Sequence, residues 1–422
     1  MKDAIAPSSM PNPLRVLVSS YRSNPFTGGQ GIYVRALSRA LRDAGCEVTV
    51  ISGPPYPELD DGIALEKLPS LDLFSEDNAL MALRPRMLLN KADRLEWLAH
   101  NTGAFAEMFS FAWRLHHFLK ANSHRFDVVH DNQTLAPAMA HIEQILPVIT
   151  TLHHPISVDR EFAIQGAGSW WRRALTARWH SFVDTQARVA RDLPRFLGVS
   201  EMARSSYAEH FGVAREKVRV ALNGVDQEVF SPDPSITREG DHIVTLASAD
   251  VPIKGLDVLI DALAILRTEG ITPRLTVIGA LREGPSKRAL KRTGLIDQVS
   301  FVSGLSEAEL VNLYRRAGIF VSASRFEGFG LPAAEAMATG APVIVSSGGA
   351  LPEVAGDAGL VFPSEDPKAL AAALRDLLAN PERRAEVGAA CLARAQSEFR
   401  WDTHAQAALD LYKEALEPTY PA

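Results

Sequence analysis

The sequence predicts an α/β protein built from two doubly wound parallel sheets, each covered by helices. Short apolar, β-branched runs alternate with longer stretches whose apolar residues recur at helical spacing. This alternation occurs twice along the 422 residues, and a proline-rich stretch, SPDPS at 231–235, separates the two series. Such alternation is typical of parallel sheets, because two parallel strands need a long crossover that is usually a helix.

The first series of elements begins near the N-terminus. Leu14–Ser20 is an apolar run that ends in small residues, and a glycine-containing loop then leads into a helical stretch at 32–45. The run Cys46–Ser52 is the next expected strand. Three later runs that end in polar loops are expected to continue the sheet: FDVVHD, PVITTLHHP and FLGVS. We therefore assign residues 1–235 to an N-terminal domain.

The second series restarts the same pattern after the linker. Its expected strands are HIVTLAS, LTVIGA, QVSFVSG, IFVSAS and PVIVSS. We assign residues 236–398 to a C-terminal domain and expect the helix within 399–422 to cross back to the first domain. Ligands of doubly wound sheets bind beyond the carboxyl ends of the strands, so we expect a ligand site between the two domains.

Composition excludes several classes of protein. Hydrophobic residues make up 46% and charged residues 22%, as in ordinary soluble domains. The two cysteines, Cys46 and Cys391, are far apart, which excludes a disulfide framework and favours a reducing, cytoplasmic setting. The start of the sequence is not typical of a signal peptide, and no apolar run is long enough to span a membrane. The net charge of -6 argues against a nucleic-acid partner.

The most informative stretch is VSASRFEGFGLPAAE, at 321–335. An expected strand ends in small residues, Glu327 lies in the following loop, and Pro332 suits the first position of a helix. The free amides at that helix start favour an anion, and Glu335 is expected in the first turn of the helix. Two carboxylates beside such a site suit a sugar nucleotide, whose diphosphate meets the amides. The alternative is a helix start with an acid placed to suit the helix dipole.

This stretch resembles the Glu-x7-Glu motif of glycosyltransferase family 4, in the form EGFGLPAAEAMATGAPVI. The similarity continues through Ser346–Leu374, and it extends more thinly to GGQGIYVRALSRAL, ALNGVDQEVFSP and the FRW before the last helix. The resemblance implies the GT-B architecture, which has two facing Rossmann-like domains. It also implies a retaining transfer of a hexose from a nucleotide-diphosphate sugar, expected to be a UDP-sugar, to a hydroxyl acceptor.

The resemblance also implies roles for residues of the second domain. Glu327 is expected to contact hydroxyls of the donor sugar, with Phe329 among the donor-binding residues. The backbone amides of Gly330 and Leu331 are expected to bind the diphosphate, and Glu335 the ribose. These assignments are hypotheses about each matched position.

Lys254, in VPIKGLDVLI, matches the phosphate-binding lysine of the family. Its ammonium is expected to offset charge on the leaving diphosphate. The alternative is a solvated lysine before a helix. The sequence departs from the family pattern at Ala249, where relatives carry an arginine that also contacts the diphosphate. Alanine cannot replace the bidentate guanidinium group of that arginine. Either another cation, such as Arg282 or Arg325, takes its place, or donor binding is weaker.

In the first domain, His153 of TTLHHP occupies the Thr-x-His position of the family, which implies a catalytic place near the anomeric carbon and the diphosphate. A structural histidine is the alternative, and we favour His153 over its neighbour His154. The turn at Gly28 and Gly29 is expected to let backbone approach the donor phosphates. GGQG does not match GxGxxG, so no NAD site is predicted.

The absence of Asp-x-Asp and HExxH motifs predicts a transfer that needs no metal and no cofactor besides the donor substrate. Two rival interpretations remain. One is a nucleotide-sugar 2-epimerase on the same architecture, and the other is a non-catalytic relative that kept the fold, for which Ala249 is the best argument.

Two stretches of the first domain suggest a lipid surface. Residues 80–120 mix basic and large apolar side chains, and residues 168–195 carry Trp170, Trp171 and Trp179 among several arginines. Basic helices rich in tryptophan are typical of membrane interfaces with anionic lipid. We expect a lipid-linked acceptor and peripheral contact with the inner face of the membrane. A helical cover with solvated arginines is the alternative.

Overall fold

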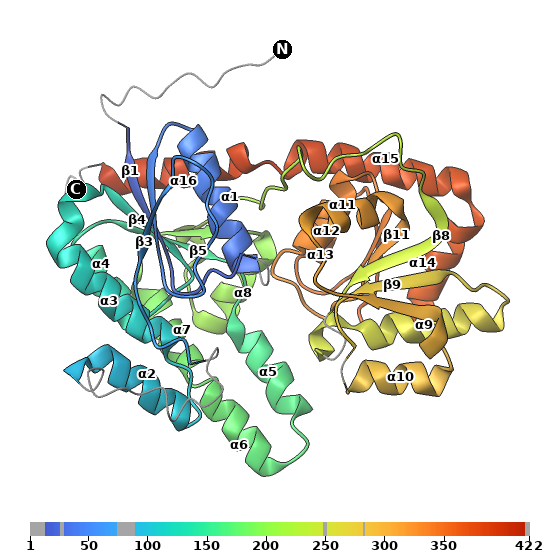
Figure 1. The fold of residues 1–422 in the computed structure, drawn as a ribbon, viewed down its shortest axis with the longest axis horizontal. Coiled ribbons are helices and arrows are strands. Elements are labelled where there is room, and N and C mark those ends of the chain that lie inside the picture. The colour runs from blue at the N-terminus through green and yellow to red at the C-terminus, as the bar shows by residue number, and fades with distance from the viewer. Residues whose placement is uncertain (1–12, 26–28, 74–88, 248–250, 282, 418–422) are drawn as a thin grey trace. The chain divides into compact units, whose positions relative to one another are not determined.

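The computed structural model describes residues 13–25, 29–73, 89–247, 251–281 and 283–417. The chain forms two compact units, each with its own sheet (Figure 1). Unit 1 comprises residues 1–199, 203–221 and 401–422, and unit 2 comprises residues 200–202 and 222–400. The predicted fold class, two parallel α/β sheets in separate domains, is confirmed.

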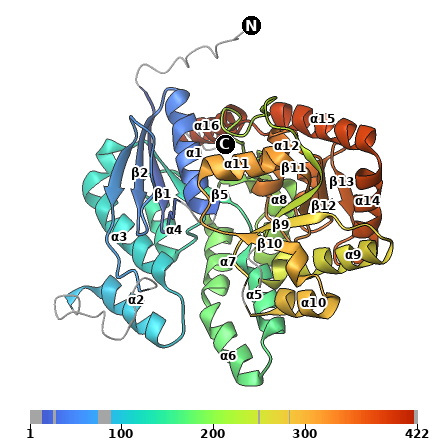
Figure 2. The ribbon, with the colours of Figure 1, turned by 45° about the vertical axis from the view of Figure 1, so that its right-hand side comes forward.

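Unit 1 is built on a seven-stranded sheet in the order β3-β2-β1-β4-β5-β6-β7. All neighbouring strands pair in parallel, and Figure 2 shows several of them side by side. The strands are β1 (Arg15–Ser20), β2 (Glu47–Ser52), β3 (Ala64–Lys67), β4 (Val128–Asn132), β5 (Val148–Leu152), β6 (Phe196–Gly198) and β7 (Val218–Val220).

Helices cover the sheet of unit 1, and the apolar positions of strands and helices form its core. Strands β4 and β5 are buried along their whole length, as expected for inner strands of a parallel sheet with both faces covered. The helices are α1 (Gly29–Asp43), α2 (Lys91–Asn101), α3 (Glu107–Asn122), α4 (Pro137–Glu143), α5 (Ile156–Gly166), α6 (Trp170–Trp179), α7 (Phe182–Asp192), α8 (Glu201–Phe211) and α16 (Trp401–Leu416). The first two residues of α8 are grouped with unit 2, and the rest of the helix belongs to unit 1.

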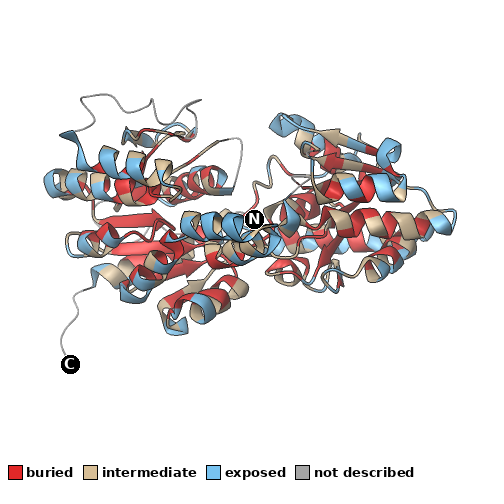
Figure 3. Cartoon of the chain, turned by 90° about the horizontal axis from the view of Figure 1, so that it is seen from below, coloured by how far each residue is buried: buried red, intermediate tan, exposed pale blue. Residues whose placement is uncertain are grey.

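Unit 2 is built on a six-stranded parallel sheet in the order β10-β9-β8-β11-β12-β13. Its strands are β8 (Glu239–Leu246), β9 (Arg274–Ile278), β10 (Val299–Val302), β11 (Ala317–Ser322), β12 (Val343–Ser346) and β13 (Leu360–Phe362). Its helices are α9 (Leu256–Thr268), α10 (Pro285–Thr293), α11 (Glu307–Arg316), α12 (Leu331–Ala338), α13 (Leu351–Ala355), α14 (Pro367–Ala379) and α15 (Pro381–Glu398). In both units buried residues concentrate on the strands and on the inner sides of the helices (Figure 3).

The division of the chain falls directly after β7, between Ala221 and Leu222, whereas the sequence placed it near residue 235. The segment after β7 is held by unit 2, since the Val225 amide donates to the Phe399 carbonyl at 3.1 Å. Arg315 also donates to the Ser231 carbonyl at 2.7 Å. The proline-rich stretch is therefore part of unit 2.

Helix α16 belongs to unit 1 and packs on α1 (Figure 1). A buried hydrogen-bonded chain joins it to the sheet. The Tyr412 hydroxyl lies 2.5 Å from His130 Nδ1, and His130 Nε2 lies 2.6 Å from the Thr151 hydroxyl. The Tyr33 hydroxyl contacts Thr151 at 2.8 Å and His404 Nε2 at 2.9 Å. The last helix is thus fixed by polar contacts as well as by apolar packing.

We expect Tyr412→Phe to destabilise unit 1 by about 1–3 kcal/mol, because a buried nitrogen of His130 loses its partner. All six tryptophans lie in unit 1, so urea unfolding followed by tryptophan fluorescence reports on this unit. Tyr56→Phe, at a partly exposed position of the same unit, is the control and should change the midpoint little. Equal midpoints for the two variants would show that the buried contact contributes nothing.

Candidate functional site

The loop between β11 and α12 in unit 2 carries the predicted anion site. Gly330 precedes α12 with φ of 102° and ψ of 46°, a left-handed conformation that favours glycine. A Cβ atom there would lie 2.6 Å from Cδ2 of Leu351. Pro332 lies in the first turn, where its missing N–H leaves no gap in the helix. The Ala333 and Ala334 amides donate to the Gly330 carbonyl at 2.9 and 3.2 Å. The Leu331 amide has no acceptor within the helix, and together with the helix dipole it favours a negative group.

Glu327 lies in this loop and forms an ion pair with Lys254. The Lys254 ammonium is 2.6 Å from Glu327 Oε1, and the Ser324 hydroxyl donates to the same oxygen at 2.8 Å. The two side chains are 29% and 18% exposed, so both remain accessible to a ligand. The structure therefore brings together two residues that are far apart in the sequence.

The backbone of Glu327 is clamped by the turn before α13. The Ala350 amide donates to the Glu327 carbonyl at 2.8 Å. Gly349 has φ of +64°, and a Cβ atom on it would lie 2.2 Å from that carbonyl oxygen. Only glycine allows so close an approach, so the position of Glu327 depends on this residue.

Glu335 is almost fully buried in α12, with an exposed fraction of 8%. Its Oε2 atom lies 3.5 Å from the Tyr314 hydroxyl. Burial raises the pKa of Glu335 to about 8, because an ionised carboxylate is poorly solvated there. The ring of Phe329 is also buried and packs against Phe399 with ring centres 5.8 Å apart, so it belongs to the core of unit 2.

Arg325 is engaged in two ion pairs. Its guanidinium contacts Asp257 at 2.9 Å and Glu365 at 2.7 Å. These carboxylates hold the side chain, so Arg325 does not offer a fork to an anion in place of the arginine missing at Ala249. Ala249 and Arg282 lie outside the residues that the structure describes.

In unit 1, His153 directly follows β5 and is partly exposed. Its Nε2 atom lies 2.7 Å from Oδ1 of Asn132, and the ring of Tyr33 meets it edge to face with centres 4.5 Å apart. Burial, with smaller effects of His404 and His154, lowers the pKa of His153 to about 3. The imidazole is therefore neutral near pH 7.

The other predicted residues of unit 1 have different surroundings. His154 contacts Asp159 at 2.5 Å through Nε2. Gly29 begins α1, and among the described residues no atom lies within 4 Å of the position that its Cβ would occupy. Gly28 lies outside the described residues.

Two residues at the end of β4 that no sequence motif marks hold His153 in place. Asn132 contacts His153, and Gln133 accepts from the backbone amides of His153 and His154 at 2.6 and 3.2 Å. Gln133 has φ of +53°, an uncommon conformation for a residue with a side chain. The available signal was the polar pair that follows the apolar run FDVVHD.

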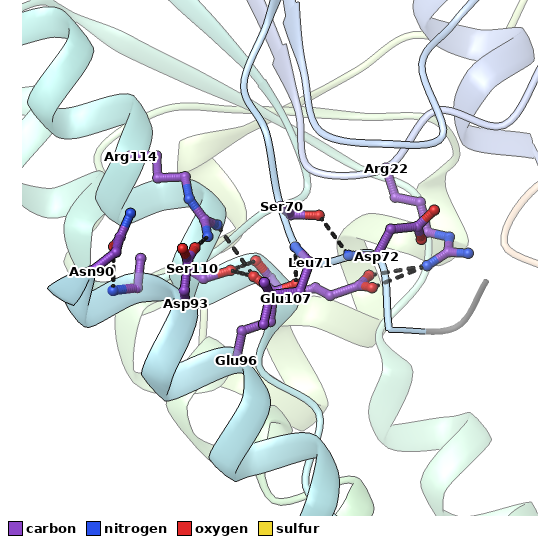
Figure 4. A network of polar contacts seen from close by, with 11 residues as sticks. Arg22, Ser70, Leu71, Asp72, Asn90, Asp93, Glu96, Glu107, Ser110 and Arg114 are labelled. Atoms are coloured by element: carbon purple, nitrogen blue, oxygen red, sulfur yellow. Dashed lines mark hydrogen bonds and ion pairs between the residues drawn. The ribbon is translucent and has the colours of Figure 1, made fainter. Parts of the chain in front are cut away.

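A second polar cluster lies beyond β1 in unit 1 (Figure 4). Arg22 contacts Glu107 at 3.1 Å, while the buried Glu96 accepts from the Leu71 amide, the Ser110 hydroxyl and Arg114. Burial raises the pKa of Glu107 to about 7, against the opposing effect of Arg22. These contacts tie α2 and α3 to the loops that follow β1 and β3.

Within the described ranges, no group of three or more His, Cys, Asp and Glu side chains is arranged to hold a metal ion. The helices of the described chain are all too short or too polar to cross a membrane.

Family models match both halves of the chain. The model described as Glycosyltransferase Family 4 matches residues 27–229, and the model described as Glycosyl transferases group 1 matches residues 230–391. An MMP alpha-(1->4)-mannosyltransferase of Mycolicibacterium hassiacum is 40% identical over 409 residues, which cover 96% of this chain and 98% of the relative. A glycogen synthase of Mycobacterium tuberculosis is 28% identical, with 95% of each chain covered.

Solved structures share the fold at low sequence identity. Sucrose-phosphate synthase from Thermosynechococcus elongatus has a TM-score of 0.71 at 21% identity, with 95% of this chain and 98% of that chain covered. Anabaena Alr3699/HepE in complex with UDP and glucose has a TM-score of 0.67 at 17% identity, with 95% and 100% covered. The chain therefore shares its overall fold with these proteins.

We expect the free energy of unfolding of Glu335→Gln, relative to that of the wild type, to increase as the pH rises. The pKa of Glu335 is about 8 in the folded protein, against an ordinary value of 4.5. The protonated carboxyl group therefore contributes its full stability below about pH 4.5, and this contribution is lost as the pH rises through 8. The loss is about 1.4 kcal/mol for each unit by which the pKa is raised. Thermal unfolding from pH 5 to 9 measures it. Glu382→Gln, on the exposed start of α15, should follow the wild-type curve, and parallel curves for Glu335→Gln would contradict the raised pKa.

Gly349→Ala is expected to destabilise unit 2 by more than the roughly 1–3 kcal/mol that left-handed strain alone costs. Gly304→Ala separates the two effects, because Gly304 has φ of +71° and no atom within 4 Å of its Cβ position. Chemical denaturation of both variants, followed by circular dichroism, measures the difference. If the two losses are equal, the close contact with Glu327 has no energetic role.

Proposed function

Because the chain belongs to glycosyltransferase family 4 and is a glycosyltransferase, we propose that it transfers a mannosyl residue. The donor is a nucleotide-diphosphate sugar, and the acceptor is a sugar hydroxyl. The proposed product carries an α-(1→4) linkage. The name of the M. hassiacum relative, which matches along nearly the whole of both chains, supports the sugar and the linkage.

The observation that carries the proposal is the geometry around the start of α12. The helix start, with its dipole and the Leu331 amide, suits the diphosphate, and the Lys254–Glu327 pair lies in the same unit beside it. Bound diphosphate supplies a second negative partner for Lys254, which frees a Glu327 oxygen to accept a hydrogen bond from a sugar hydroxyl. Glu335 offers its buried carboxyl group to the ribose hydroxyls.

We propose that transfer proceeds with retention and without a metal or other cofactor. The bond between the anomeric carbon and the diphosphate oxygen breaks, and the acceptor oxygen bonds to that carbon from the same face. The acceptor proton passes to the departing phosphate oxygen, so charge and atoms balance. Lys254 and the α12 amides stabilise the charge that builds on the leaving group.

We expect Lys254→Met to lower kcat for transfer about a hundredfold or more, because one preorganised charge that stabilises the transition state is lost. Lys368→Met, at an exposed lysine in the first turn of α14, is the matched control and should keep wild-type kinetics. Release of nucleoside diphosphate measures both variants. Near wild-type turnover of Lys254→Met would remove Lys254 from the mechanism.

The donor base is tested by thermal stabilisation with UDP- and GDP-linked mannose and glucose. The resemblance to the family leads us to expect a UDP-sugar, and the relative's name favours mannose. Mass spectrometry and proton NMR of the products then give the linkage and its anomeric configuration. A β-linked product contradicts retention, and a changed nucleotide sugar formed without acceptor would favour the epimerase alternative.

We further propose a cytoplasmic enzyme whose acceptor is lipid-linked and which contacts anionic membrane through unit 1. Both cysteines are buried and unpaired, as expected in a reducing compartment. Trp170 and Trp171 are 81% and 48% exposed on α6, beside Arg172 and Arg173. Trp179, in contrast, packs against Phe105. Basic residues beside exposed tryptophans suit an anionic interface.

Vesicle flotation tests the membrane contact. We expect binding to vesicles that contain phosphatidylglycerol, weaker binding to phosphatidylcholine alone, and loss of binding in a Trp170→Ser, Trp171→Ser double variant. Unchanged transfer to a soluble acceptor by this variant is the control for folding. Equal recovery of wild type and variant would favour the alternative of a solvated helical cover.

A further inference from the structure

The end of β4 holds His153 through a side chain that no sequence motif marks. Asn132 is fully buried at this strand end, and its Oδ1 atom lies 2.7 Å from Nε2 of His153. An imidazole nitrogen that contacts an amide oxygen carries the hydrogen, because an amide oxygen only accepts. The orientation of the Asn132 amide therefore decides which nitrogen of His153 is protonated.

Ser20 decides that orientation. Its hydroxyl donates to the Arg22 carbonyl at 3.1 Å, and Nδ2 of Asn132 lies 3.2 Å from the same hydroxyl oxygen. A hydroxyl has one hydrogen, so the oxygen of Ser20 is left to accept, and the amide presents its N–H to it. Oδ1 of Asn132 consequently faces His153, and Nε2 is the protonated nitrogen.

The His153 ring is also held from the side of α1. The Tyr33 ring meets it at an interplanar angle of 88°, and the Tyr33 hydroxyl is itself fixed by Thr151 and His404. The titratable neighbours of the ring are Tyr33, His130, His154 and His404, and burial together with His404 and His154 keeps the pKa of His153 low. A neutral imidazole protonated at Nε2 has a free lone pair on Nδ1.

We propose that Asn132 is a positioning residue of the transfer reaction, which reserves Nδ1 of His153 to accept a hydrogen bond from a sugar hydroxyl. In this state His153 has no hydrogen to donate from Nδ1. Stabilisation of the diphosphate is left to Lys254 and the amides of α12. This role rests on the proposed glycosyl transfer, whereas the tautomer of His153 does not.

The tautomer is measured directly by ¹⁵N NMR of the full chain labelled at histidine, with His153→Gln identifying the signals of His153. We expect a protonated Nε2 and an unprotonated Nδ1 near pH 7. A hydrogen on Nδ1, or a charged ring, overturns the proposal. Because no transfer is assayed, this outcome is distinct from failure of the proposed function.

Kinetics of two variants test the consequence for the reaction. Asn132→Leu removes the acceptor at similar volume, and we expect kcat to fall about tenfold or more while KM for the nucleotide sugar changes little. Asn132→Asp keeps an oxygen for Nε2–H but raises the pKa of the imidazole. We expect it to retain kcat near pH 8 and to lose activity toward pH 6, where the wild type shows no such loss.

The matched control is Asn122→Leu, since the Asn122 amide donates to the Phe118 carbonyl at 2.8 Å within α3, away from the strand ends. It should leave kcat and the His153 signals unchanged. If Asn132→Leu does not fold, Ser20→Ala removes the anchor of the amide and should give mixed tautomers with a smaller loss of kcat. A folded Asn132→Leu or Ser20→Ala variant with wild-type kcat and tautomer overturns the proposal.

Discussion

Parallel pairing of every strand is the constraint on which the candidate sites depend. Because all strands of one sheet run in the same direction, their carboxyl ends meet at a single edge, and the loops that follow them become neighbours. In unit 1 this edge brings Asn132, at the end of β4, beside His153 after β5. In unit 2 it brings Lys254, which follows β8, to Glu327 after β11. Residues separated by 73 positions thus form one ion pair.

Burial then sets the charge state of these groups. His130 and His153 lie where desolvation lowers the pKa of each to about 3, so both remain neutral and act through fixed hydrogen bonds. Glu335 is the opposite case, since burial raises the pKa of its carboxyl group. The ion pair of Lys254 and Glu327 is more exposed, with 29% and 18% of the two side chains accessible. Unit 1 therefore offers neutral hydrogen-bonding groups, and unit 2 offers charge and backbone amides.

Sequence-based prediction agreed with the structure where few other residue types can adopt the required backbone conformation. Gly330 and Pro332 are at the helix start where the motif placed them, and Glu327 lies in the preceding loop. It was a poorer guide where the partner of a side chain decides its role. Arg325 was a candidate substitute for a missing arginine, but Asp257 and Glu365 hold it. Phe329 was counted with the donor site, and its ring packs against Phe399. The linker at 231–235 carried turn residues, yet hydrogen bonds attach it to unit 2.

By itself, the order of apolar runs and helical stretches determined two parallel α/β sheets, and the Glu-x7-Glu stretch determined the family. Both could be recognised in the sequence because hydrophobic periodicity and turn preferences depend on residues that are neighbours along the chain. Only the tertiary structure decided that Asn132 and Gln133 hold His153, that Gly349 supports Glu327, and that the chain changes unit directly after β7. The physical reason is that such contacts join positions distant along the chain. Their geometry follows from strand order, register and burial, which no local pattern of residues encodes.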